Sequence, residues 1–214
     1  GLEMRSEKIL NGLSKLGDMF ILNFIYVLSC IPIITIGAST TALYYTTLKM
    51  AENNESYVWR DYWKAFKSNL KQATVIWLIV FAGWAVVALD FLIAGGLSMQ
   101  LGTVVAIWVV VVAVFLGILG LYVFPLLARF DNTVVRTMKN AVMIAIRHLP
   151  STILIALIHA VPLLVAFVSI EAFLKGFIVI MLFAASPLAY LESKLFVKVF
   201  RRYYPKTECV EAAS

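Results

Sequence analysis

The sequence contains few charged residues. Only 14% of its 214 residues are Asp, Glu, Lys or Arg, against about 25% in an average soluble domain. Hydrophobic residues make up 62% of the chain, and the mean hydropathy is +0.93. These values exclude a soluble globular domain and a disordered chain, and they predict an integral membrane protein. Two cysteines, Cys30 and Cys209, are too few for the disulfide framework of a small secreted domain.

The sequence also lacks the usual catalytic and cofactor motifs. No glycine-rich run is followed by Lys and Ser or Thr, so there is no phosphate-binding loop. His148 and His159 have no cysteine near them, and neither a G-x-S-x-G nor an S-x-x-K run occurs. We therefore expect no enzymatic activity, no cofactor and no metal. The pI of about 9.3 is explained by the basic residues that cytoplasmic segments of membrane proteins collect, so we also expect no nucleic-acid partner.

Apolar stretches divide the chain. Four of them, at residues 72–94, 101–128, 151–170 and 173–191, have the length of about 20 residues that crosses a hydrocarbon core. A fifth stretch, 19–36, is interrupted by Pro32 and followed by a run of small residues that contains Gly37 and Thr40. A weakly polar helical stretch, 42–50, comes next.

The distribution of Lys and Arg sets the expected topology. If residues 19–50 form a hairpin that turns at 36–40, all of the 18 basic residues except Lys175 lie on one side. We therefore predict an all-α, polytopic transmembrane helical bundle of about six membrane segments in three hairpins, the first pair short or re-entrant. Both termini are expected on the cytoplasmic side of a bacterial cell membrane. In the alternative, residues 19–36 span once and the chain has five spans.

The chain is expected to hold one domain. Met4 reads as the native start, which makes residues 1–3 the remnant of an expression tag. Residues 4–206 then form a single integral membrane domain, and residues 207–214 a flexible cytoplasmic tail.

A basic amphipathic segment precedes each expected hairpin. In the clearest one, residues 59–71, aromatic side chains such as Trp63 recur at helical spacing, and a basic stripe that begins at Arg60 runs beside them. Segments 9–16 and 134–147 repeat the pattern more faintly. Such helices lie in the headgroup plane with their cations toward anionic lipids. They either anchor the protein and fix its topology or dock a partner.

Ionisable residues inside a membrane are costly and are therefore candidates for function. Asp90 and His159 are the two in the confident spans, and we expect a depth difference of roughly 13 Å between them, too large for a direct pair. Asp90 is expected to be solvated or bound to a helix N-terminus near the outer surface. His159 is expected either to bond a hydroxyl group across a helix interface or to relay protons. Prolines within the spans, including Pro187 beside Ser186, produce ordinary kinks or the broken helices of transporter sites.

Several runs resemble the YesL-like family of small bacterial integral membrane proteins, grouped under a domain of unknown function. They are GLSKLGD at 12–18 with Asn23, IPIITIGASTTALY at 31–44, WRDYW at 59–63 and FKSNLKQAT at 66–74. The resemblance covers the chain from Met4 to about Tyr204. It implies a genomic context of carbohydrate ABC importers and supplies no catalytic residues.

Two functions are therefore expected as alternatives. In the first, the chain is a non-catalytic accessory protein of a carbohydrate ABC uptake system and contacts its permeases. In the second, it transports a small solute or a lipid on its own, as a transporter or channel and possibly as an oligomer. The candidate functional residues are His159, Asp90, Pro32, Gly37, Thr40, Arg60, Asp61 and Trp63.

Overall fold

A computed structural model describes residues 2–54 and 57–204, and this part of the chain is helical with no strand. The first half contains α1 (Leu2–Cys30), the 3-10 helix η1 (Ile33–Thr35), α2 (Ile36–Ala51), α3 (Val58–Ala94) and α4 (Met99–Arg129). The second half contains α5 (Val134–Arg147), α6 (Leu149–Val168), α7 (Ile170–Val179), the π-helix η2 (Ile180–Ala184), α8 (Ala185–Phe200) and the 3-10 helix η3 (Arg201–Tyr203). The predicted tail at 207–214 lies outside the described residues. Cys30 is a free thiol, and Cys209 falls within that tail.

Five helical segments among the described residues are long and apolar enough to cross a membrane. They are Glu3–Cys30, Val58–Ala94, Met99–Arg129, Leu149–Val168 and Ile170–Tyr203. The prediction of an all-α polytopic membrane protein is thus confirmed, whereas the count of six segments is not. The sixth predicted segment corresponds to α2, whose 16 residues measure about 24 Å, short of a hydrocarbon core of about 30 Å.

The first hairpin turns earlier than the sequence suggested. The chain reverses at Ile31–Thr35, after α1 ends, and not at residues 36–40. Gly37 and Thr40 lie inside α2. A Cβ atom on Gly37 would lie 2.5 Å from the carbonyl oxygen of Ala73 and 2.7 Å from the Cβ of Trp77. The small residues therefore let α2 pack directly against α3, and the turn itself is made by Pro32 and η1.

Two of the three predicted interfacial segments are not separate helices. Residues 9–16 are part of α1, and residues 59–71 are part of α3, which runs without a break for 37 residues. Only the third segment forms its own helix, α5, which is strongly amphipathic. Its N-cap is the side chain of Thr133, which accepts a hydrogen bond from the backbone N–H of Arg136. A helix that is amphipathic at one end and apolar at the other can thus continue from the membrane surface into the bilayer.

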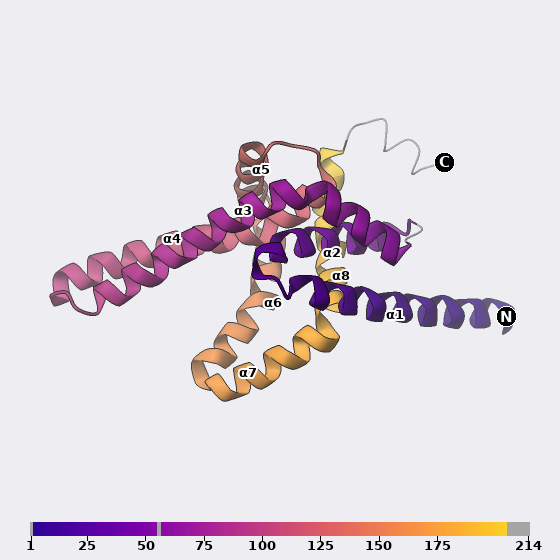
Figure 1. The fold of residues 1–214 in the computed structure, drawn as a ribbon, viewed down its shortest axis with the longest axis horizontal. Coiled ribbons are helices and arrows are strands. Elements are labelled where there is room, and N and C mark those ends of the chain that lie inside the picture. The colour runs from indigo at the N-terminus through magenta and orange to yellow at the C-terminus, as the bar shows by residue number, and fades with distance from the viewer. Residues whose placement is uncertain (1, 55–56, 205–214) are drawn as a thin grey trace.

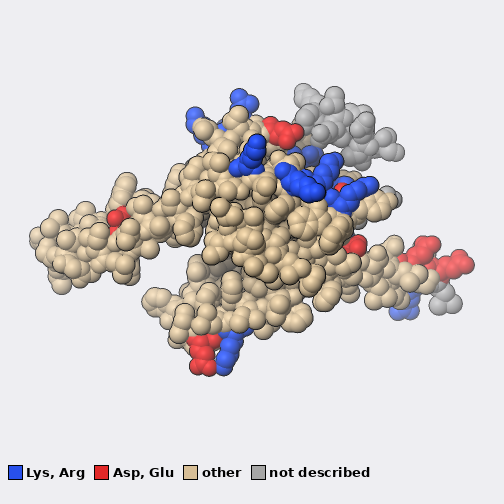
Figure 2. Space-filling view, viewed as in Figure 1, with Lys and Arg blue, Asp and Glu red and all other residues tan. Residues whose placement is uncertain are grey.

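The helices are arranged around α2, which is the most buried of them. It packs against α3, α8, α4 and α1, and most of its side chains are buried. The α3–α4 hairpin and the α6–α7 hairpin extend away from this core in different directions (Figure 1). Lys and Arg side chains gather over the part of the molecule where α5 and the start of α3 lie, and the α3–α4 hairpin is almost uncharged (Figure 2). The core therefore joins a charged surface to two apolar hairpins.

Candidate functional site

A cavity of about 450 Å³ lies between the α6–α7 hairpin and the core helices α1, α2 and α8. Its walls are mostly apolar and aromatic, and α6 contributes Pro162. Five polar side chains from four helices also line the cavity: Tyr26, Thr40, Tyr44, His159 and Glu192. Apolar walls with a few convergent polar groups are the usual form of a small-molecule site.

The carboxylate of Glu192 is the most buried charge-bearing group of this cavity. Its side chain is 3% exposed. The Tyr44 hydroxyl donates a hydrogen bond to its Oε2 at 2.5 Å, and His159 Nδ1 lies 3.5 Å from its Oε1. A carboxylate held among apolar side chains is costly unless it has hydrogen bonds and a positive partner. Tyr44 supplies the first, and a protonated His159 or a bound cation supplies the second.

The His159 ring is oriented by two acceptors on one side. Its Nδ1 lies 3.0 Å from the carbonyl oxygen of Ile155 as well as 3.5 Å from the Glu192 carboxylate. Because both neighbours only accept hydrogen bonds, Nδ1 carries the proton. The expected hydroxyl partner of His159 is wrong, because the nearby hydroxyl of Tyr44 bonds Glu192 instead. In neutral His159, Nε2 is therefore the nitrogen that can accept a proton.

Polar contacts between α2 and α8 fix the position of Glu192. One turn beyond the Tyr44–Glu192 bond, the hydroxyls of Thr47 and Ser193 are 2.8 Å apart. The ring of Phe196 stands edge-on to Tyr44 at 5.8 Å. The Thr47 hydroxyl also donates to the carbonyl of Leu43 at 3.0 Å, so it is satisfied within its own helix. Glu192 thus projects from a rigid two-helix interface.

A break in the last helix lies beside the cavity. Between α7 and α8, the π-helix η2 interrupts the regular hydrogen-bond pattern just before Pro187. Asn23 of α1 donates to the carbonyls of Met181 at 2.9 Å and Leu182 at 2.6 Å, and its Oδ1 accepts from the backbone N–H of Ser186 at 3.0 Å. One side chain therefore pairs three backbone groups at the break.

The other predicted site residues fall into separate places. Asp61 is buried in α3, 3.0 Å from the amino group of Lys49, and its carboxylate accepts from the backbone N–H of Tyr57. Arg60 is exposed, with its guanidinium 4.6 Å from the Tyr57 ring centroid. Trp63 packs edge-on against Tyr62 at 5.5 Å. The Asp61–Lys49 pair holds the start of α3 to the end of α2, and all three predicted residues lie outside the cavity.

Three predicted candidates remain. Asp90 lies near the free end of the α3–α4 hairpin and is half-buried. The carboxylate beside His159 is that of Glu192, 3.5 Å away. Pro32 and Gly37 shape the first hairpin and its packing. Thr40 and His159 are therefore the two predicted candidates that line the cavity.

Glu192, Tyr44, Tyr26 and Asn23 are site residues that sequence reasoning did not identify. Glu192 directly follows the apolar stretch 173–191, so the sequence gives no sign that it is buried. In the structure, α8 continues past Glu192 to Phe200, and tertiary contacts bury Glu192. The available signal was spacing: Thr40 and Tyr44 are four residues apart and share a helix face.

One protein-family model matches the chain, over residues 19–91, and it is described as a protein of unknown function, DUF624. The match covers about a third of the chain and runs from the second half of α1 through α2 to most of α3. It includes Tyr26, Thr40 and Tyr44 of the cavity. No curated protein and no solved structure matches the chain.

Proposed function

We propose that the protein is a transporter that acts without a partner and binds a small amphipathic solute in the cavity beside Glu192. The solute has an apolar body and a cationic head. The single observation that carries the proposal is the Glu192 carboxylate, 3% exposed and bonded by Tyr44, at the edge of a 450 Å³ cavity with apolar walls.

The charge balance of the site supports a cationic head. A carboxylate in this environment is stabilised by a proton on His159 or by the positive charge of a ligand. Binding of a cation beside Glu192 and protonation of His159 therefore compete, since each neutralises the same charge. Such competition is a physical basis for exchange of a solute against a proton.

The local backbone supports transport as the use of the site. Transporters place their sites at broken helices, where one half can move relative to the other. Here the break η2 contributes Ile180 and Met181 to the cavity wall. The α6–α7 hairpin forms the opposite wall, and its end bears the exposed pair Glu171 and Lys175, 2.6 Å apart. Movement of this hairpin about η2 would open the cavity.

Uptake of tetraphenylphosphonium into vesicles that contain only this protein tests the proposal. Glu192→Gln keeps the size of the side chain and an acceptor for Tyr44 but removes the charge. We expect it to weaken tetraphenylphosphonium binding about tenfold or more, since an ion pair in a poorly solvated site contributes more than about 1.4 kcal/mol. Glu171→Gln makes the same change at an exposed position and should bind as the wild type does. Equal uptake by both variants, or no uptake above protein-free vesicles, contradicts the proposal.

The topology is part of the same proposal: both termini and the turn between α2 and α3 face the cytoplasm of a bacterial cell. The clustering of basic side chains supports it (Figure 2). Single cysteines at Asn54 and Ser98, with Cys30 and Cys209 replaced, should react oppositely with an impermeant maleimide in intact cells. Ser98 should be labelled and Asn54 protected. Labelling of Asn54 would place the α2–α3 turn outside and support the five-span alternative.

The first expectation, an accessory subunit of a carbohydrate importer, stays a prediction. It rests on the resemblance to the YesL-like family, and we favour the transporter because the cavity gives it a site.

A further inference from the structure

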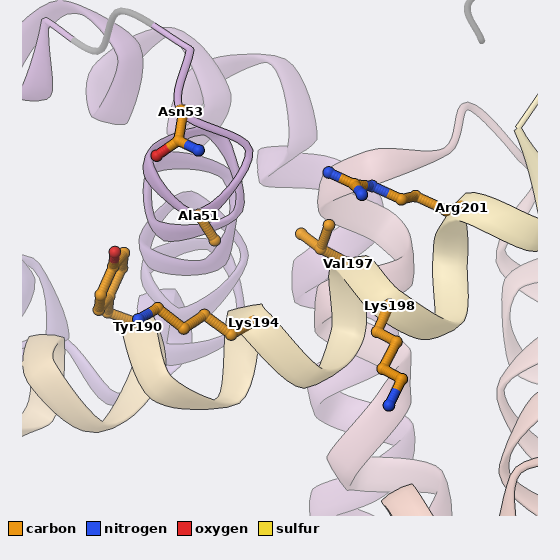
Figure 3. Close-up of a pocket in the computed structure, with 7 residues that line it drawn as sticks. All are labelled: Ala51, Asn53, Tyr190, Lys194, Val197, Lys198 and Arg201. Carbon is orange, nitrogen blue, oxygen red and sulfur yellow. The ribbon is translucent and has the colours of Figure 1, made fainter. Parts of the chain in front are cut away.

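A second hollow, of about 410 Å³, lies between the end of α2 and the outer half of α8. Three basic side chains of α8 and its C-cap line it: Lys194, Lys198 and Arg201. Arg201 extends from the end of α8 back toward α2, Lys194 extends along α8 toward Tyr190, and Lys198 points away from α2 (Figure 3). The lining contains no Asp or Glu, so this hollow is strongly positive.

The positive charge of this hollow is not balanced within the described part of the chain. Two partly buried cations of the core do have carboxylate partners: Lys49 lies 3.0 Å from Asp61, and Arg129 lies 3.9 Å from Glu52. In residues 2–54 and 57–204, Lys194, Lys198 and Arg201 form no ion pair with a carboxylate.

A second lysine increases the positive potential at the edge of the hollow. The amino groups of Lys15, from α1, and Lys194 both lie 4.8 Å from the centroid of the Tyr190 ring. Tyr190 is itself part of the lining. The aromatic ring attracts each cation, but it carries no net charge, and the two like charges repel each other. An anion beside them would remove that repulsion.

Asn53 adds a neutral donor on the opposite wall. It ends α2 in the left-handed conformation, with φ 58°. The backbone N–H of Asn54 donates to the carbonyl of Lys49 at 3.1 Å, and that of Asn53 to the carbonyl of Met50 at 3.2 Å, which is the Schellman arrangement. This turn holds the Asn53 amide at the hollow (Figure 3). Its N–H groups can donate to an oxygen anion.

The position of the hollow indicates which anion binds. It lies near the C-terminal end of the candidate span Ile170–Tyr203, which is the level of the lipid headgroups. Lys and Arg side chains close to the membrane surface attract anionic lipids, and Arg binds phosphate oxygens in a bidentate manner. We infer that this hollow is a binding site for the phosphate group of an anionic phospholipid, held by Lys194, Arg201 and Asn53.

This site is distinct from the cavity at Glu192 and does not depend on the proposed transport. Cations in the last turn of a helix commonly offset the helix dipole, and that role would not distinguish one basic surface from another. If the hollow is a specific lipid site, lipid binding depends on the residues that line it and not on the overall positive charge. A matched pair of variants separates the two.

Native mass spectrometry of the full chain in mild detergent, titrated with short-chain phosphatidylglycerol, tests the inference. The variant Lys194→Gln/Arg201→Gln removes two charges from the hollow, and Lys64→Gln/Lys67→Gln removes two exposed charges from α3. We expect the first to weaken phosphatidylglycerol binding about tenfold or more and the second to change it less than about twofold. Phosphatidylcholine, which has the same phosphate but no net charge, should bind more weakly to the wild type.

A further variant and a soluble probe complete the experiment. Asn53→Gly keeps the left-handed turn, which glycine favours, and removes only the amide, so a severalfold loss of lipid binding is expected from a protein that folds normally. Glycerol 3-phosphate is titrated in parallel. If it binds as tightly as the lipid, and this binding is lost in Lys194→Gln/Arg201→Gln, the hollow takes a soluble phosphate and the lipid assignment is wrong. Equal losses in both charge variants, or no binding of either probe, overturn the site.

Discussion

The helices around α2 and the α3–α4 hairpin are stabilised in different ways. In the core, α2 is short, and the hydroxyls of Thr41, Thr46 and Thr47 are paired with its own carbonyls or with Ser193 of α8. The hairpin consists of long apolar helices whose outer parts are largely exposed in the isolated chain, as at Phe91 and Leu92. Hydrogen bonds and close backbone packing hold the first region, and the hydrocarbon of the bilayer is the solvent of the second.

This difference teaches where the chain tolerates change. In the core, α2 and α3 approach closely, and Asn23 pairs three backbone groups at η2, so an added methyl group or a lost amide has no compensation there. On the outward face of the hairpin, side chains face lipid, and an added methyl group at Gly117 meets no neighbour within 4 Å. Glycines occur in both regions, and α1 contains one buried and one exposed asparagine, so identical substitutions can be compared.

The largest effect is expected at Gly37. In Gly37→Ala, the new Cβ meets the Ala73 carbonyl at 2.5 Å and the Trp77 Cβ at 2.7 Å, so α2 and α3 must move apart. We expect the free energy of unfolding to fall by about 3 kcal/mol. Gly117→Ala, in α4, has nothing within 4 Å and should leave stability unchanged or raise it by up to about 1 kcal/mol. Thermal unfolding in detergent measures both, and similar losses in the two variants would contradict the close packing of α2.

A smaller loss is expected at Asn23. Asn23→Ala leaves the carbonyls of Met181 and Leu182 and the N–H of Ser186 without their partner. An unpaired buried polar group costs about 1–3 kcal/mol, and water or local rearrangement of η2 offsets part of the total, so we expect a fall of about 2 kcal/mol in the free energy of unfolding.

Asn11→Ala is the control for Asn23→Ala, because Asn11 is in the same helix but exposed. It should be close to neutral in the same unfolding assay. If Asn23→Ala is neutral as well, the π-helix does not need this side chain, and the break at η2 is stable on its own.

The sequence was sufficient for the parts of the fold that follow from local pattern. Long apolar runs predicted α3, α4 and α6 as spans, and the amphipathic run 134–147 predicted α5. The turn of the first hairpin was placed wrongly, because the small residues from Gly37 to Thr40 suit a tight turn as well as a close helix contact. Composition alone does not separate the two. Only the position of Ala73 and Trp77 on α3 does, and that is a long-range contact.

The difference between local pattern and long-range contact also explains which residues of the cavity could be predicted. His159 could be found because it is ionisable within an apolar run, a local signal. Glu192 could not, because its burial depends on α2, which lies far from it in the sequence. Tyr44 looked like an ordinary aromatic residue for the same reason. Pairing between distant helices is what converts these residues into a site.

The unbroken length of α3 has a mechanical consequence. Ala73, whose carbonyl leaves no room for a Cβ at Gly37 of α2, lies about 22 Å from the start of the helix at Val58 and about 31 Å from its end at Ala94. The contact with Gly37 thus divides α3 into a shorter basic part and a longer apolar part. A tilt of α3 at this point moves its two ends in opposite directions, and the outer end moves farther than the basic end.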